Sequence, residues 1–519
     1  MGDALNQSRS LSYALAGISG LLLALSFPQF GLAAVAWVAL APLLVAVQRA
    51  SLRDAFLQGL LTGVVYFTGT LYWISNVMAV YGDLPVAVAV LINALLIAYL
   101  SLFPAVFALV MRRFSLAIGL RSLLLAPCAW VATEMGRMYI MTGFPWVLLG
   151  YSQVTVLPVA QLASVAGVFG VSALVASLSA ALAYAALAGR LAPASSQPRG
   201  AFAPYRPLVL VLGVVVGVGS WGAARIRDGA LTRQGDAVTV GLVQGNVDQA
   251  DKWDPSRASA IFRQYLDMTR NAIAKGAQLV IWPESSTPFF FEEDRPGAEM
   301  VRAIARESRV PILLGSDQID RSTTPPQYFN SAFLVRPDGS TGGVYRKVHL
   351  VPFGEYVPLK GLLFFAERLV ENVSDFSAGD AAVLLPARGH LVSTAICYEI
   401  VYPDLVRRAA AASELITTIT NDAWFGHTSA PYQHFAQASM RAIENGRYLV
   451  RSANTGITGI VDPYGRVLAQ TAIFEPAVVV GEARFLRQQT IYARIGDVCA
   501  TASTVVTILA LVLLRRRVE

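Results

Sequence analysis

Residues 390–400 read HLVSTAICYEI, an apolar run rich in β-branched residues that ends near Cys397. A continuous run of this kind is typical of a strand buried on both faces. Similar runs occur at AQLVIWPES (277–285) and ELITTITNDAWF (414–425), and segments with helical periodicity lie between the apolar runs. This alternation predicts an α/β domain in which helices cover a sheet. We expect further strands at 237–247 and 310–316, a hairpin at 457–470, and helices at 256–275, 297–309 and 432–447.

Outside this domain the chain is much more apolar. Over 519 residues it is 55% hydrophobic and only 14% charged, whereas an ordinary soluble domain carries ~25% charged residues. This composition excludes a plain cytosolic enzyme, a disordered protein and a coiled coil, and it predicts a membrane protein. We expect three parts: a membrane domain at 1–230, a globular catalytic domain at 237–485, and a last span with a basic tail at 486–519.

The apolar runs predict about eight membrane-spanning helices, because a span needs ~20 mostly apolar residues. Lys and Arg gather in alternate loops between the runs, so the positive-inside rule places the N-terminus in the cytoplasm. Residues 225–490 then lie across the membrane, in the periplasm of a Gram-negative cell, and Arg515–Arg517 end the chain inside. The expected spans are 11–27, 31–48, 56–79, 85–111, 121–141, 158–188, 206–224 and 495–514.

The placement of the charged residues argues against a nucleic-acid-binding protein. A net charge of +7 could suggest nucleic-acid binding, but no Lys/Arg-rich run with interleaved aromatic residues occurs in the globular part.

Glu134 and Arg137, one helical turn apart in the fifth run, are interpreted as a self-neutralising pair, with a functional role as the alternative. Cys128 and Cys499 lie in apolar runs, so Cys397 has no plausible disulfide partner.

Three side chains at or after predicted strands could form a reactive site. Glu284 closes the run LVIWPE, Lys347 follows the strand-like GGVY, and Cys397 closes VSTAIC. Chemistry in α/β domains gathers at the carboxyl ends of strands. A carboxylate can take the proton of a thiol, while an ammonium favours the thiolate and stabilises an oxyanion. Each signal alone is weak, since such residues are more often core or solvated surface, but together they suit nucleophilic catalysis.

The segments around these residues resemble the nitrilase, or carbon–nitrogen hydrolase, superfamily, and they occur in that superfamily's order. The resemblance implies an α-β-β-α sandwich and carries Glu284, Lys347 and Cys397 over as a Glu-Lys-Cys triad. It also implies supporting roles for Glu355, Tyr398 and Glu399, and the backbone N–H of Tyr398 is placed to serve an oxyanion hole. The matching segments are WPES (282–285), YRKVHLVPFGEYVP (345–358) and ICYEIVYPD (396–404).

With the spans included, nearly the whole chain resembles the apolipoprotein N-acyltransferase family of Gram-negative bacteria. That resemblance implies ping-pong transfer: Cys397 takes an acyl chain from the sn-1 position of phosphatidylethanolamine as a thioester. The α-amino group of an S-diacylglyceryl cysteine at a lipoprotein N-terminus then receives it, which is the last step of lipoprotein maturation. The family-like strings are TGFPW (142–146), GYSQ (150–153), QGNV (244–247), KWDP (252–255) and NDAWFG (421–426).

Several loops near the motifs are unusually apolar for a soluble domain: PFFF (288–291), LKGLLFFAERLV (359–370) and AWF (423–425). Exposed apolar patches usually mark partner or membrane surfaces, although the same residues could fill the core. We interpret 359–370 as an amphipathic lid that faces the bilayer. Candidates for substrate binding are Trp253, which could equally be packing, Trp424 and Phe425.

The sequence offers little support for other ligands or other functions. His427 and His434 lack the spacing of a zinc helix, and no Gly-rich phosphate loop occurs, so we expect no metal, cofactor or nucleic acid. The expected partners are a phospholipid donor, a lipoprotein acceptor and the membrane, with the chain acting as a monomer. The alternatives are a membrane-tethered amidase with the same triad and a non-catalytic scaffold. Eight spans favour a lipid substrate, and a complete triad disfavours a scaffold.

Overall fold

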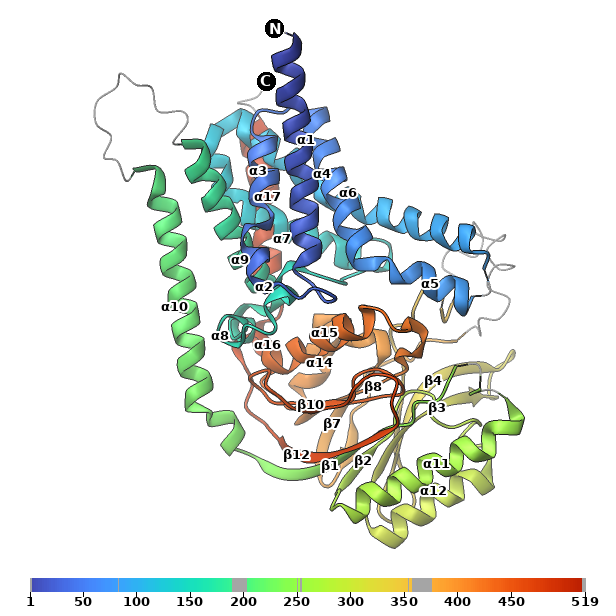
Figure 1. Cartoon of the computed structure of the whole chain (residues 1–519). Coiled ribbons are helices and arrows are strands. Elements are labelled where there is room, and N and C mark those ends of the chain that lie inside the picture. Colours follow the sequence, from blue (N-terminus) through green and yellow to red (C-terminus); the bar gives the residue numbers. More distant parts are fainter. Residues whose placement is uncertain are drawn as a thin grey trace. The chain divides into compact units, whose positions relative to one another are not determined.

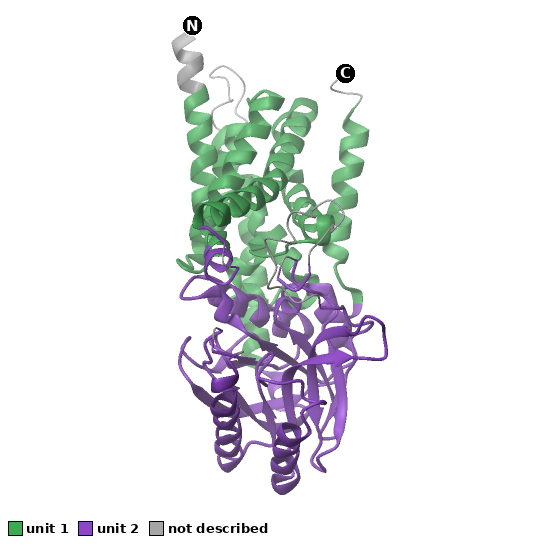
Figure 2. Ribbon diagram, turned by 90° about the vertical axis from the view of Figure 1, so that its right-hand side faces the viewer, with its two compact units in different colours: residues 1–75, 86–228, 495–519 green, residues 76–85, 229–494 purple. Residues whose placement is uncertain are grey.

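The computed structural model describes residues 2–82, 84–188, 203–249, 251–252, 254–352, 354–356 and 376–515. These residues form two compact units, coloured separately in Figure 2. Unit 1 contains Met1–Ser75, Val86–Asp228 and Ile495–Glu519, and unit 2 contains Asn76–Pro85 and Gly229–Arg494. Trp253 and the predicted lid at 359–370 lie outside the described residues.

Unit 1 is helical, and a helix occupies each of the apolar ranges (Figure 1). The described α-helices that lie wholly or partly in it are α1 (Gly2–Leu25), α2 (Ala33–Ala39), α3 (Ala41–Val47), α4 (Leu52–Leu71), α5 (Trp73–Val80), α6 (Val86–Ile118), α7 (Ala126–Tyr139), α8 (Leu157–Ala160), α9 (Ala163–Ala188), α10 (Arg206–Asp228), α16 (Ile491–Ile495) and α17 (Val498–Leu514).

Not all of these helices are long enough to span a bilayer unaided. Among the described residues, Val86–Thr142, Ala163–Ala188 and Ala203–Arg233 have the length and composition to cross a membrane, and α4 with α5, bent by 51°, would be a fourth. The predicted spans 85–111 and 121–141 fall within the first of these, because 3-10 turns at Gly119–Leu125 connect α6 to α7. A helical N-terminal region with apolar helices is therefore established, whereas the number eight stays a prediction.

The buried charges of α7 hold a neighbouring loop. Glu134 accepts the backbone N–H of Leu149 at 2.7 Å, and Arg137 donates to the carbonyl of Trp146 at 2.7 Å. Backbone groups in an apolar surrounding need such partners, because water cannot supply them. The prediction of a self-neutralising pair is therefore incomplete, since both charges are also bonded to the backbone of the loop after α7.

The described strands of unit 2 form two six-stranded sheets. The first has the order β12-β1-β2-β3-β4-β5 and the second the order β11-β10-β9-β8-β7-β6. The strands are β1 (Asp236–Gln244), β2 (Leu279–Ile281), β3 (Ile312–Asp320), β4 (Gln327–Val335), β5 (Thr341–Arg346), β6 (Leu385–Ala387), β7 (His390–Ile396), β8 (Leu415–Thr420), β9 (Leu449–Ala453), β10 (Gly459–Val461), β11 (Val467–Gln470) and β12 (Ala477–Phe485).

Helices cover the outer face of each sheet, so unit 2 has four layers (Figure 1). α11 (Pro255–Ala274) and α12 (Arg295–Ser308) pack on the first sheet, and α14 (Pro403–Ala411) and α15 (Ala430–Asn445) pack on the second. β1, β2 and β3 run parallel, as do β7, β8 and β9. The carboxyl ends of these central strands therefore gather at one edge of each sheet, where α/β enzymes place their chemistry.

Two rings of the PFFF segment pack against the core of unit 2. Phe291 is fully buried, and its ring lies 5.3 Å from that of Phe333. Phe289 is half-buried and packs edge-on against Phe262 of α11 at 4.9 Å, and Gly297 of α12 leaves room for it. Of the two alternatives left open for 288–291, core packing therefore holds for Phe291 and in part for Phe289.

Candidate active site

Glu284 follows β2 and is held by two hydrogen bonds. The side-chain amide of Asn330 donates to Oε1 at 2.7 Å, and the backbone N–H of Asn421 donates to Oε2 at 2.7 Å. A side chain at Gly315 on β3 would bring its Cβ to 2.7 Å from the Cα of Glu284. The glycine thus allows the turn after β2 to pack against β3, which fixes the carboxylate at the sheet edge.

Lys347 follows β5 and lies between two carboxylates. Its Nζ donates to Oε1 of Glu355 at 2.8 Å and lies 3.6 Å from Oε1 of Glu284. Burial alone would lower the pKa of Lys347, but the charges of Glu355 and Glu284 outweigh it and raise that pKa above its ordinary value. Lys347 is therefore a fixed positive charge, although it is only 1% exposed.

Cys397 is the first residue after β7, at the start of a 3-10 turn. Its φ is +53°, a left-handed conformation that costs a non-glycine residue free energy and often marks a functional site. Burial and then the charge of Glu284 raise the pKa of the thiol, while Lys347 lowers it in part. The thiol is therefore within electrostatic reach of both other members of the predicted triad.

Glu399 ties the segment that carries Lys347 to the turn that carries Cys397. Its Oε1 accepts the hydroxyl of Tyr345 at 2.7 Å and the backbone N–H groups of Val348 and His349 at 2.7 and 3.0 Å. Its Oε2 accepts the N–H of Ile396 at 2.7 Å. All four partners donate, so the site needs an acceptor-only carboxylate here.

Replacing Glu399 with Gln is expected to lower stability without removing any reacting group. The amide would turn an N–H₂ toward at least one of the four donors, which costs about 2 kcal/mol. A loss of that size corresponds to a fall of roughly 4–8 °C in melting temperature for a domain of this size. Thermal unfolding of the full chain measures this loss, with Glu482→Gln as the control because Glu482 is exposed on β12. Equal melting temperatures for the two variants would contradict the anchoring role of Glu399.

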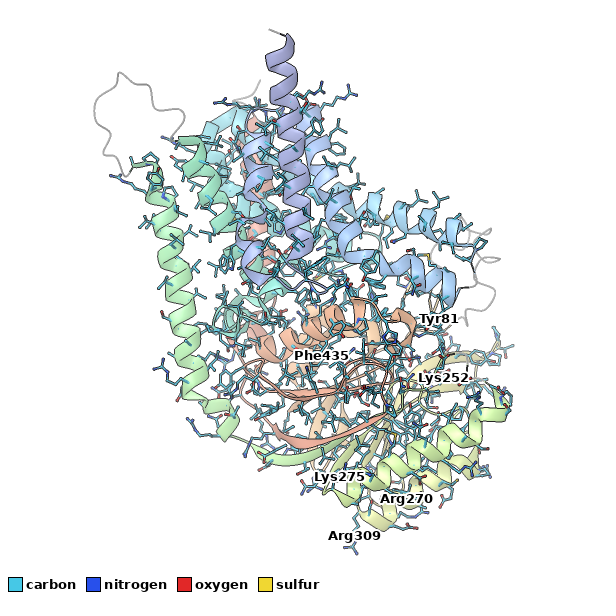
Figure 3. All side chains as sticks on the ribbon, viewed as in Figure 1. Tyr81, Lys252, Arg270, Lys275, Arg309 and Phe435 are labelled. Atoms are coloured by element: carbon cyan, nitrogen blue, oxygen red, sulfur yellow. The ribbon has the colours of Figure 1, made fainter. Side chains whose placement is uncertain are left out.

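Trp424 and Phe425 follow β8, and their rings contact different residues. Trp424 is 37% exposed, and its ring meets Tyr81 edge-on at 5.2 Å. The Tyr81 hydroxyl donates to the carbonyl of Ala423 at 2.8 Å, and Figure 3 labels this tyrosine. Phe425 faces the ring of His434 at 5.9 Å. Residues 76–79, expected to end the third span, therefore group with unit 2, because the segment around Tyr81 packs on the loop after β8.

Several buried polar residues around the three predicted side chains were not predicted from the sequence. Asn330 bridges Glu284 and Glu355, donating to both at 2.7 and 2.9 Å. Lys252 and Asp317 are also buried, and Ser285 donates to Asp317 at 2.8 Å. The signal that could have found Asn330 is a polar residue inside the apolar strand NSAFLV.

Comparison with known proteins shows which protein family the chain resembles over most of its length. Residues 19–181 match the family described as apolipoprotein N-acyltransferase N-terminal domain, and residues 239–490 match carbon-nitrogen hydrolase. An apolipoprotein N-acyltransferase of Geobacter metallireducens is 40% identical over 504 residues, which cover 96% of this chain and 95% of that protein. The chain belongs to the apolipoprotein N-acyltransferase family. A further member, from Methylococcus capsulatus, is 37% identical over 93% of this chain and 92% of its own length.

These matches confirm both resemblances: the carbon–nitrogen hydrolase superfamily, predicted from the three motif segments, and the apolipoprotein N-acyltransferase family, predicted from the spans and the family-like strings. They establish a membrane-bound acyltransferase whose carbon–nitrogen hydrolase domain occupies residues 239–490.

Proposed function

We propose that the chain N-acylates lipoproteins by a ping-pong reaction at a Glu284–Lys347–Cys397 triad. The observation that carries the proposal is the convergence of these side chains from three separate strand ends. Lys347 lies 3.6 Å from Glu284, and the charges of both residues shift the pKa of the Cys397 thiol. A base, a fixed cation and a nucleophile are the three groups that acyl transfer through a thioester needs.

In the first half-reaction Glu284 takes the thiol proton as Sγ of Cys397 attacks the sn-1 ester carbonyl of phosphatidylethanolamine. Lys347 and the backbone N–H of Tyr398 stabilise the tetrahedral oxyanion. The oxyanion collapses, the C–O bond to glycerol breaks, and Glu284 returns the proton to the leaving oxygen. A thioester on Cys397 and a free lysophospholipid result.

In the second half-reaction the neutral α-amino group of an S-diacylglyceryl cysteine attacks the thioester carbonyl. Glu284 accepts a proton from the amine, the C–S bond breaks, and the proton returns to Cys397. The product is an amide at the lipoprotein N-terminus. Glu355 supports both steps, because its hydrogen bond at 2.8 Å holds Lys347 in place.

The surroundings of the triad support lipid substrates. Trp424, 37% exposed on the loop after β8, offers an apolar surface to an acyl chain. In the membrane arrangement that we propose, residues 1–230 anchor the chain in the inner membrane and residues 237–485 work in the periplasm. Residues 486–519 return to the cytoplasm, where the N-terminus also lies, and the chain acts as a monomer.

The proposal is tested by intact mass spectrometry of the purified full chain in detergent. Incubation with phosphatidylethanolamine is expected to add the mass of one acyl group, located on Cys397 by peptide mapping. Adding a peptide with an N-terminal S-diacylglyceryl cysteine is then expected to move that mass to the peptide amine.

Cys397→Ala is the control, and it should show neither adduct nor product. An adduct of equal size in Cys397→Ala would contradict the thioester. Release of free fatty acid with no acylated peptide would instead favour a hydrolase of the amidase kind.

A further inference from the structure

A buried polar network lies directly behind the proposed nucleophile. His434 is on α15, beside Phe435, which Figure 3 labels. His434 is 0% exposed, and its Nε2 lies 3.1 Å from the backbone carbonyl oxygen of Cys397. Its Nδ1 lies 3.0 Å from Oδ1 of Asp422 and 3.0 Å from Nη2 of Arg451. Arg451 also donates to Oδ2 of Asp422 at 2.7 Å.

The contact with Cys397 fixes the role of Nε2. A carbonyl oxygen can only accept, so Nε2 must carry the hydrogen that bonds to Cys397. Nδ1 lies equally near a donor, Nη2 of Arg451, and an acceptor, Oδ1 of Asp422, and Nε2 donates to Cys397 whether or not Nδ1 carries a hydrogen. Burial and then the charge of Arg451 lower the pKa of His434, in agreement with a neutral ring. Asp422, paired with Arg451, keeps that guanidinium against the ring.

The hydrogen bond to Cys397 also sets the direction of the next N–H. The peptide unit between Cys397 and Tyr398 is planar, so its carbonyl and its N–H point in opposite directions. Holding the carbonyl toward His434 therefore aims the N–H of Tyr398 away from the network. Cys397 has a φ of +53°, which the chain adopts only where its surroundings hold it.

We propose that His434 is a positioning residue for acyl transfer: its Nε2–H holds the Cys397–Tyr398 peptide so that the Tyr398 N–H faces the oxyanion. Asp422 and Arg451 orient the imidazole. The inference rests on the proposed function, in which that N–H is an oxyanion donor.

The test compares two reactions of the same thiol in the full chain. Acylation by phosphatidylethanolamine forms an oxyanion, whereas alkylation of Cys397 by iodoacetamide does not. His434→Phe keeps a ring but removes the donor, and it is expected to slow acylation by about 10²–10³-fold, the usual loss for one oxyanion donor. Alkylation of Cys397 should stay close to the wild-type rate. His434→Gln, whose amide can donate to the same carbonyl, should recover most of the acylation rate.

His390→Phe is the matched control, because it removes a half-buried histidine that bonds Glu414 at 2.8 Å on the other end of β7. It should acylate like wild type. Equal losses of acylation and alkylation in His434→Phe would overturn the proposal. It would also be overturned if His434→Gln acylated no faster than His434→Phe while the two variants had the same melting temperature. A wild-type chain that is never acylated on Cys397 would contradict the proposed function itself, which is a separate result.

Discussion

Glu284→Gln is expected to slow acylation of Cys397 by up to about 10⁴-fold, the upper range for loss of a general base. Burial and the charge of Glu284 raise the pKa of the Cys397 thiol, so the resting enzyme holds a thiol and not a thiolate. The proton must therefore leave as Sγ attacks, and an amide cannot accept it. Initial rates of adduct formation by intact mass, for wild type and variant, measure the effect.

The pH dependence separates this role from a structural one. A thiol with a raised pKa gains thiolate about tenfold per pH unit below that pKa, so acylation in the Gln variant should rise with pH. The wild type, which uses its own base, should depend on pH much less over the same neutral to mildly alkaline range. Acylation in Glu284→Gln at the wild-type rate near neutral pH would remove Glu284 as the base.

A matched variant controls for the loss of a buried carboxylate. Glu444 is fully buried on α15 and pairs with Arg441 at 2.8 Å. Glu444→Gln is expected to lose stability but to keep most of its acylation rate. Glu284→Gln should also lose about 1–3 kcal/mol, because its amide N–H₂ would face the donors Asn330 or Asn421. If the two variants lost acylation equally, the base assignment would fail.

Glu284 and Cys397 could be proposed from sequence because β2 and β7 are buried and have parallel neighbours, whereas β5, which precedes Lys347, is antiparallel to β4 and half-buried. Buried parallel strands read as continuous apolar runs, so their ends are visible as the points where polar residues begin. β7 ends at Ile396, so the strand is shorter than the predicted 390–400 and Cys397 is the first residue after it. β2 proved shorter than the run AQLVIWPES, but Glu284 still lies just beyond its end.

Most of the residues that support them could not be found in this way. Asp422 and Arg451 are buried only because strands far apart in the chain pack together, and no local pattern predicts such burial. The same holds for His434. The sequence shows it as an ordinary polar residue of the predicted helix 432–447 and does not indicate that it contacts the end of β7. β12 was missed as well, since its partner β1 lies at the opposite end of the domain sequence.

Hydropathy located the helices of unit 1 but not their breaks. The run 56–79 reads as one span, yet the helix bends by 51° between α4 and α5. Beyond the bend, Asn76–Pro85 groups with unit 2, where the Tyr81 hydroxyl donates to Ala423 and its ring meets Trp424. Hydropathy carries no signal for contacts of this kind.

Lys347→Met is expected to cost both acylation and stability. Without the ammonium the oxyanion loses a charged partner, which lowers the acylation rate by about 10²–10³-fold. Removing one partner of a buried ion pair also costs about 3–5 kcal/mol, because Glu284 and Glu355 would then face each other uncompensated. Acylation by intact mass and thermal unfolding measure the two losses separately. Lys252→Met removes another buried lysine of unit 2 and should lose far less acylation.

The double variant Lys347→Met with Glu355→Gln tells the two losses apart. Lys347 donates to Glu355 at 2.8 Å but lies 3.6 Å from Glu284, so the greater part of the strain in Lys347→Met should come from Glu355. Neutralising Glu355 removes the like-charge repulsion and should raise the melting temperature above that of Lys347→Met. Acylation should stay low, because nothing replaces the cation at the oxyanion. If acylation recovered with stability, Lys347 would act through the fold alone and its proposed electrostatic role would be wrong.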